Sequence, residues 1–214
     1  MKQAISNSNV LAARFALAPF DGDWLRHLGR PALNGIWFVY GKSGSGKTTY
    51  CLRLAKYLCR FVDRVAYNSL EQGMSPSMQQ AWVRCGMEEA GRKIVLLDRE
   101  PLAELIKRLK KRHSPDVVFI DSVLYMEDSP ARDIIALRHR FPSKLFVLTG
   151  QERNGDARDA KQLRIKHDAD IKVRCVGGVA LCETRYSTTD GYGGGDYIIY
   201  EARKKRFEAE LNEQ

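Results

Sequence analysis

The residues best suited to chemistry form one short stretch, Gly41-Lys42-Ser43-Gly44-Ser45-Gly46-Lys47-Thr48. This stretch fits the pattern G-x-x-x-x-G-K-[ST] at every position. Glycines let backbone N–H groups wrap around phosphates, and the start of a following helix adds a favourable field. Lys47 can neutralise the β and γ phosphates, and the Thr48 hydroxyl can ligate Mg²⁺. The sequence therefore predicts a site for ATP and Mg²⁺ whose nucleotide-binding residues are Gly41, Ser43, Gly44, Ser45, Gly46, Lys47, Thr48 and Thr49.

The segments on either side of this loop have the character that the motif requires. An apolar stretch, residues 36–40, runs straight into the loop and is typical of a buried strand. After the loop, one face of a predicted helix carries Cys51, Leu52, Ala55, Leu58 and Cys59. A strand, a glycine-rich loop and a helix in this order distinguish a phosphate-binding loop from a glycine-rich turn that matches by accident.

Length, charge and cysteine content narrow the class of protein. A chain of 214 residues suits one α/β domain with a substantial core. The net charge of +9 favours polyanionic partners such as nucleic acid, although an ordinary basic surface gives the same value. The five cysteines fall in apolar patterns without a C-x-x-C pair, so we expect reduced core residues rather than a zinc site. Without a long apolar run or a signal-peptide pattern, the sequence predicts a cytoplasmic protein with no membrane partner.

Apolar strands alternate with helical patterns along the middle of the chain. The pattern predicts strands at residues 65–69, 94–98, 117–121 and 145–149, and helices near 75–85, 102–109 and 128–139. This alternation favours an α/β fold, a mainly parallel sheet with helices on both faces. Two strands joined by Gly177-Gly178 predict a C-terminal antiparallel hairpin, with a last strand at 197–200. We expect a single domain, 1–214, with an N-terminal segment (1–35) and a charged tail (203–214) that is helical or frayed.

Three polar residues stand where predicted strands end. Asp121 closes the strand 117–121, where a carboxylate can hold Mg²⁺; an aspartate that simply ends a strand is the alternative. Glu71 follows the strand 65–69 and is either a general base for the water that attacks the γ-phosphate or a solvated strand-end residue. Gln151, just past the strand 145–149, either responds to the γ-phosphate or is an exposed loop glutamine.

The order of these features resembles the RecA-like ATPase core, in particular the RadA/Sms recombination ATPases and the DnaB-type replicative helicases. The resemblance covers residues 35–202 and implies that Glu71 activates water. It also implies that a loop after Gln151 contacts single-stranded DNA. In Glu183-Thr184-Arg185-Tyr186, Arg185 matches the arginine of a Lys-x-Arg motif that reaches into the ATP site of a neighbouring subunit, and Glu183 replaces the lysine.

Basic residues follow Gln151 and can track the phosphate backbone of DNA. Acidic residues dilute their charge, and the segment has no aromatic rings for base stacking. A denser basic cluster, residues 107–113, is typical of a solvated helix face. The candidates for DNA contact are Arg153, Arg158, Lys161, Arg164 and Lys166.

These features predict a homo-oligomeric, Mg²⁺-dependent ATPase that couples ATP hydrolysis to DNA recombination, repair or helicase-type translocation. Its predicted catalytic residues are Lys47, Glu71, Gln151 and Arg185, and its predicted metal ligands are Thr48 and Asp121. One alternative is a small-molecule kinase that uses the segment 151–166 as a mobile lid. Another is an ATP-gated loader or adaptor with little turnover. The sequence leaves open ring versus filament, subunit number, and DNA versus RNA.

Overall fold

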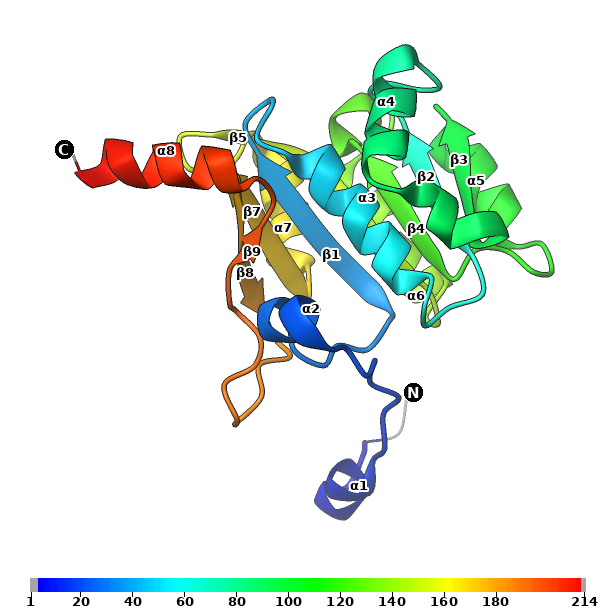
Figure 1. Ribbon diagram of the computed structural model, residues 1–214. Helices are drawn as coiled ribbons and strands as arrows, with labels where there is room; N and C mark the ends of the chain where they lie inside the picture. The colour runs from blue at the N-terminus through cyan, green and yellow to red at the C-terminus, as the bar shows by residue number, and fades with distance from the viewer. Residues whose placement is uncertain (1–3, 213–214) are drawn as a thin grey trace.

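The sheet at the centre of the molecule has its strands in the order β3-β2-β4-β5-β1-β7-β8-β9 (Figure 1). The structure is a computed structural model and describes residues 4–212. The parallel strands are β1 (Gly35–Gly41), β2 (Val65–Ser69), β3 (Ile94–Asp98), β4 (Val117–Asp121), β5 (Leu145–Arg153) and β7 (Ile171–Val176). The antiparallel additions are β6 (Asp156–Ala157) beside β5, then β8 (Val179–Thr184) and β9 (Tyr197–Ile198). The predicted α/β fold, a mainly parallel sheet with a C-terminal antiparallel hairpin, is confirmed.

Helices cover both faces of the sheet, and alternate residues of β1 enter two separate apolar layers. Trp37 and Val39 belong to one layer, whereas Ile36, Phe38 and Tyr40 belong to the other. The first layer is covered by α2 (Gly22–Leu28), α3 (Lys47–Leu58), α4 (Pro76–Arg84) and the 3-10 segment η1 (Met87–Lys93), and the second by α5 (Leu102–Leu109), α6 (Ala131–Arg140) and α7 (Ala160–Asp168). Within residues 4–212, no helix has the length and apolar character needed to cross a membrane.

The pairing register brings the ends of several strands to one edge of the sheet. Gly41 of β1 lies opposite Gln151 of β5. Ser69 of β2 lies opposite Asp121 of β4. Strand β5 therefore separates the strand that leads into the glycine-rich loop from the strand that ends in Asp121. Ligands of parallel α/β sheets bind outside the carboxyl ends of the strands, so a site is expected at this edge.

Some elements differ from those expected from the sequence. The segment after Gln151, which was predicted to be a loop, is instead the end of β5, strand β6 and helix α7. Helix α7 forms because the Asp159 side chain accepts a hydrogen bond from the Gln162 N–H and so caps its first turn. The last strand covers only Tyr197–Ile198, and the charged tail becomes helix α8 (Glu201–Asn212). Residues 213–214 of the predicted tail lie outside the described residues.

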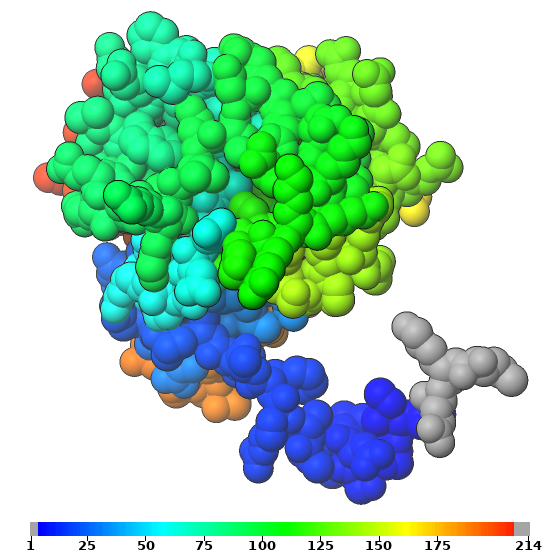
Figure 2. Space-filling model, turned by 90° about the vertical axis from the view of Figure 1, so that its right-hand side faces the viewer, coloured from blue at the N-terminus to red at the C-terminus, as the bar shows by residue number. Residues whose placement is uncertain are grey.

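The N-terminal part of the chain projects from the body of the molecule (Figures 1 and 2). It carries helix α1 (Asn7–Ala12), which has no buried residue. Leu11 and Phe15 are each 77% exposed. The chain rejoins the core at Ala18 and Phe20, which are buried. We call residues 4–17 the N-terminal arm; several exposed apolar side chains on one segment are typical of a contact surface for another chain.

Buried His27 fastens the glycine-rich segment before β9 to helix α3. Its Nδ1 lies 2.6 Å from the Gly195 carbonyl oxygen, and its Nε2 lies 2.9 Å from the Tyr50 hydroxyl oxygen. The carbonyl must accept, so Nδ1 carries the proton and Nε2 accepts from Tyr50. Burial lowers the pKa of His27 from its ordinary 6.5 to about 4, so the ring is neutral in the folded protein at pH 7.

We expect the free energy of unfolding to fall as the pH drops from 6.5 to about 4, because unfolded His27 takes up a proton before folded His27 does. The contribution lost over this window is about 3 kcal/mol. In urea unfolding followed by tryptophan fluorescence, His27→Gln should show a shallower pH dependence than the wild type. His139→Gln, which replaces an exposed histidine, should match the wild type. Parallel pH curves for wild type and His27→Gln would contradict this role.

Candidate functional site

The glycine-rich loop connects the end of β1 to the first turn of α3. Gly46 is the N-cap residue of α3 and has a φ of 101°, which favours glycine. No side chain caps this helix, so the N–H groups of its first turn are open to an anion. A Cβ at Gly41 would lie 2.4 Å from the Cys175 carbonyl oxygen, so this position requires glycine as well. The loop therefore has the backbone form that a phosphate site needs.

Lys47 is folded against this loop. Its Nζ donates to the carbonyl oxygens of Gly41 and Lys42, each at 2.9 Å. The residue is 8% exposed, so its ammonium group is held inside the loop rather than in solvent. Ser45, in the same loop, has a buried hydroxyl without a hydrogen-bond partner among the described residues. Phosphate oxygens are stronger partners for the ammonium than carbonyls are, so these residues fit a triphosphate.

Asp121 is the buried carboxylate of the site. It is 3% exposed and accepts hydrogen bonds from three hydroxyls. Tyr67 of β2 and Thr149 of β5 each donate at 2.6 Å, and Thr48 of α3 donates at 3.2 Å. Burial, and then the charge of Asp121, raise the pKa of Tyr67 well above its ordinary value, so Tyr67 stays a donor. Four elements of the fold thus meet at one carboxylate.

The Thr48 hydroxyl and the Asp121 carboxylate are oxygen donors of the kind that Mg²⁺ prefers. Their oxygens lie 3.2 Å apart at the mouth of the phosphate loop. Among residues 4–212, no group of three or more His, Cys, Asp or Glu side chains is placed to hold a metal ion. Mg²⁺ is commonly held by one or two protein ligands together with phosphate and water oxygens, and this donor set fits such a site.

Glu71 lies beside this carboxylate. The backbone N–H groups of Leu70 and Glu71 donate to the Asp121 carbonyl oxygen at 2.7 and 3.0 Å, which joins the ends of β2 and β4. The Glu71 side chain is open to solvent. Partial desolvation by the surrounding protein raises its pKa, the Asp121 charge raises it further, and the Lys47 charge lowers it. Glu71, Asp121 and Lys47 are therefore close enough to interact.

Gln151 and Arg158 form a pair at the same edge. Arg158 donates from Nη1 to the Gln151 side-chain oxygen at 2.8 Å. Tyr125 belongs to the 3-10 segment η2 (Val123–Tyr125). Burial and then the charge of Glu71 raise the pKa of Tyr125, and the charge of Arg158 lowers it. Arg158 was predicted to contact DNA; in the structure its guanidinium is hydrogen-bonded to Gln151 at this edge of the sheet.

The other basic residues predicted to contact DNA lie in different surroundings. Lys161 donates to a backbone carbonyl, and Lys166 forms an ion pair with an aspartate at 2.7 Å. Arg153 and Arg164 are exposed. Counting Arg158, three of these five cations already have polar partners within the chain.

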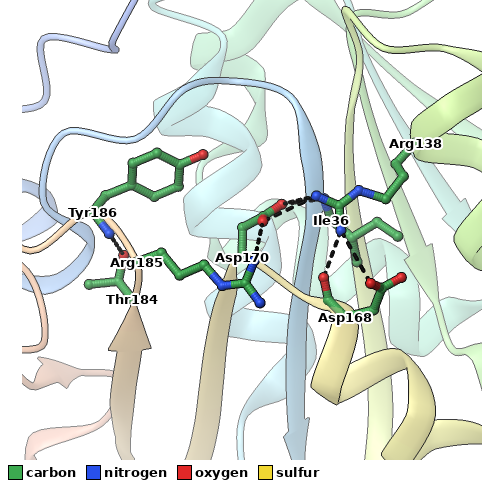
Figure 3. Close-up of polar contacts among 7 residues, drawn as sticks. All are labelled: Ile36, Arg138, Asp168, Asp170, Thr184, Arg185 and Tyr186. Carbon is green, nitrogen blue, oxygen red and sulfur yellow. Dashed lines mark hydrogen bonds and ion pairs between the residues drawn. The ribbon is translucent and has the colours of Figure 1, made fainter. Parts of the chain in front are cut away.

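Arg185 lies at the opposite edge of the sheet, next to Thr184, and its side chain points toward Asp170 (Figure 3). Strand β8 runs antiparallel to β7, so its last residue, Thr184, pairs with Ile171 at the start of β7. Arg185 forms an ion pair with Asp170 at 3.3 Å, and Arg138 pairs with the same carboxylate at 3.1 Å. The Arg185 side chain is 61% exposed. It lies far from the phosphate loop of its own chain, so a contact with nucleotide would be made in another subunit.

The segment after β9 closes one side of the phosphate loop, a contact that the sequence analysis missed. The Tyr200 hydroxyl lies 2.6 Å from Thr49 Oγ1. Arg203, in the first turn of α8, donates to the Gly44 carbonyl oxygen at 2.7 Å. The nucleotide contact of Thr49 stays a prediction, and its hydroxyl lies beside Tyr200 in this structure. The alternating apolar and charged residues of this segment carry no signal of such a contact.

Comparisons with known proteins identify the fold. No protein-family model matches the chain, and no curated protein does. The flagellar accessory protein FlaH of Methanocaldococcus jannaschii superposes with a TM-score of 0.58 at 15% identity, over 87% of this chain and 96% of FlaH. The KaiC-like protein PH0186 of Pyrococcus horikoshii OT3 gives 0.57 at 15% identity, over 79% of this chain and 87% of PH0186. This chain has the RecA-like fold. The finer resemblance to RadA/Sms and DnaB-type proteins stays a prediction, as do the residue roles in this RecA-like core.

We expect Thr149→Val to raise the Mg²⁺ concentration needed for tight ATP binding by about 10-fold to 100-fold. Valine keeps the shape of threonine but donates no hydrogen bond to Asp121. A fluorescent ATP analogue titrated at several Mg²⁺ concentrations measures the shift. Thr184→Val, which removes a hydroxyl bonded to the Leu28 carbonyl, is the control and should behave as the wild type. An unchanged Mg²⁺ requirement in Thr149→Val would show that Asp121 does not serve the metal.

Proposed function

We propose that this chain is a Mg²⁺-dependent ATP hydrolase whose reaction takes place at the carboxyl edge of the sheet. The proposal rests mainly on the position of Glu71, whose backbone N–H donates to the Asp121 carbonyl oxygen at 3.0 Å and whose side chain is exposed at this edge. A protein that only binds nucleotide has no need of a solvent-accessible carboxylate beside its phosphate loop and metal ligands. A general base that activates water needs to be there.

Each residue of the site has a role that follows from its position. Lys47 exchanges the carbonyl oxygens of its loop for those of the β and γ phosphates. Thr48 and Asp121 hold Mg²⁺, which when bound supplies positive charge along the phosphates. Glu71 accepts a proton from the attacking water, and its raised pKa makes it a better base than an ordinary glutamate. Gln151, opposite the start of the loop, responds to the γ-phosphate.

We further propose that several copies of the chain assemble and use ATP hydrolysis to act on DNA, in recombination, repair or helicase-type translocation. The net charge of +9 supports a polyanionic partner. The exposed Leu11 and Phe15 of the N-terminal arm support contacts between copies. FlaH and PH0186 are described as a flagellar accessory protein and a KaiC-like protein, so the DNA partner rests on the charge of this chain.

Glu71→Gln should lower the turnover of ATP by about 10²-fold to 10⁴-fold and leave the affinity for ATP nearly unchanged, because glutamine accepts no proton. Phosphate release and equilibrium binding of an ATP analogue measure the two quantities. In the wild type, turnover should rise with pH as Glu71 loses its proton. Because the pKa of Glu71 is raised, this rise should occur at a higher pH than it would for an ordinary glutamate.

Glu88→Gln, which changes an exposed glutamate of η1, is the matched control and should keep wild-type turnover. Normal turnover in Glu71→Gln would contradict the role of Glu71. Transfer of the γ-phosphate to a nucleoside or metabolite in place of water would support the kinase alternative and contradict the hydrolase.

Arg185→Ala should lower turnover by about 10³-fold, the lower end of what an arginine supplied in trans contributes. Mixing it with Lys47→Ala subunits should restore part of the activity, because one variant keeps the phosphate loop and the other keeps the arginine. Arg138→Lys is the control, because lysine keeps a positive charge beside Asp170; this variant should not lower turnover. If no mixing ratio restores activity, the site is not shared between subunits.

A further inference from the structure

A cavity of about 720 Å³ lies beside α3, away from the phosphate loop. It is bordered by α2, by the end of α4, by η1 and by β9; α3 crosses the front of the sheet between α2 and α4 (Figure 1). We call this cavity the α3 cleft. Its basic lining residues are Arg53, Lys56, Arg60, Arg84 and Lys93.

The positive charge of the α3 cleft is only partly compensated. Lys56 and Arg60 are paired with carboxylates at 3.1 and 2.8 Å. Arg53 and Lys93 donate to backbone carbonyls, which satisfy their N–H groups without cancelling their charge. The Arg84 side chain has no hydrogen bond or ion pair within the described part of the chain. The cleft therefore keeps a net positive charge that favours an anionic ligand.

The spacing of these cations suits a linear polyanion. Arg53 and Lys56 lie three residues apart on one side of α3, and Arg60 follows two residues after the helix ends at Leu58. With a rise of about 1.5 Å per residue, Arg53 and Lys56 are separated by about 4.5 Å along the helix, and Arg60 extends the row beyond it. A single phosphate group would engage only part of this row.

Aromatic rings line the same cleft. Trp24, Tyr57 and Tyr197 contribute to its wall; Trp24 and Tyr57 are buried, so the partly exposed Tyr197 is the ring that a base can reach. Tyr197 stacks on Trp24 with ring centroids 4.3 Å apart, so its ring is fixed in place. Basic residues interleaved with aromatic rings are typical of surfaces that bind single-stranded nucleic acid, because unpaired bases offer their faces for stacking. An acidic peptide would use the charge and leave the exposed surface of Tyr197 unused.

The segment that the sequence analysis favoured for DNA is a poorer match. Residues 151–168 carry five Lys or Arg residues but also four Asp or Glu residues, and no Phe, Trp or Tyr. The α3 cleft has five cations, and two carboxylates are paired with them. Charge and aromatic content both favour the cleft.

We infer that the α3 cleft binds a single strand of nucleic acid along its phosphate backbone. The inference rests on the proposed function in one respect, because it assigns a surface to the polyanionic partner. Helix α3 begins at the phosphate loop and also lines the cleft. Arg53 donates to the Ile199 carbonyl oxygen at 2.9 Å, next to Tyr200, which meets Thr49 in the first turn of α3. The helix thus joins the two sites, and any coupling between ATP and the strand must be reciprocal.

The test is binding of a fluorescein-labelled single strand of about 20 nucleotides by the full chain, measured by anisotropy at several salt concentrations. Lys56→Gln combined with Arg84→Gln removes two cations from the cleft. We expect this variant to bind about ten-fold more weakly, with a salt slope smaller by about 1.4, because each lost phosphate contact removes about 0.7. Its ATP turnover without nucleic acid should equal that of the wild type.

Two variants with the same change in charge are the controls. Lys110→Gln with Lys111→Gln removes two exposed cations beside α5 and should bind as the wild type. Arg153→Gln with Arg164→Gln tests the earlier candidate segment and should lose less affinity than the cleft variant. Wild-type binding by the cleft variant, a larger loss in the Arg153 and Arg164 variant, or equal competition by polyglutamate would overturn the inference. Absence of strand binding with ATP turnover intact would overturn it while leaving the hydrolase standing.

Discussion

The buried carboxylate of Asp121 is the contact on which the site depends. A carboxylate loses its hydration on burial, so it is stable there only when hydrogen-bond donors replace the water. Here the donors are hydroxyls of Tyr67, Thr149 and Thr48, which come from two neighbouring strands and from the helix after the phosphate loop. The same strand ends carry Glu71 and Gln151. Satisfying one buried charge therefore fixes the phosphate loop, the candidate metal ligands and the candidate base relative to one another.

The phosphate loop and most strands could be predicted from the sequence because their signals are local. Glycines at Gly41 and Gly46 are required by the backbone of the loop, and apolar runs mark the strands. The donors to Asp121 could not be predicted in this way. Tyr67 and Thr149 lie in apolar strands, and only the order and register of the sheet bring them to one carboxylate. For the same reason the sequence did not reveal that Arg158 lies beside Gln151, or that Arg203 contacts Gly44.

The two edges of the sheet carry different groups of residues of the proposed ATPase. The carboxyl edge holds every candidate group that would touch the nucleotide of its own chain. Tyr200 and Arg203 contact the phosphate loop and the first turn of α3 at this edge. The amino edge holds Arg185, an exposed cation fixed by Asp170 and so presented to a neighbour. Helix α3 lies between the phosphate loop and the basic cleft. On the proposed function, this separation would let ATP, a second subunit and a nucleic-acid strand bind one small core without competing for the same surface.

The most direct measurement is an experimental structure of the chain with Mg²⁺ and a non-hydrolysable ATP analogue. We predict that Lys47 Nζ leaves the Gly41 and Lys42 carbonyls for phosphate oxygens, and that Mg²⁺ lies at Thr48 beside Asp121. We also predict a water within about 3 Å of the Glu71 carboxylate, placed to attack the γ-phosphate. An analogue bound elsewhere, or a Glu71 side chain turned away with no water between it and the γ-phosphate, would contradict ATP hydrolysis at this edge.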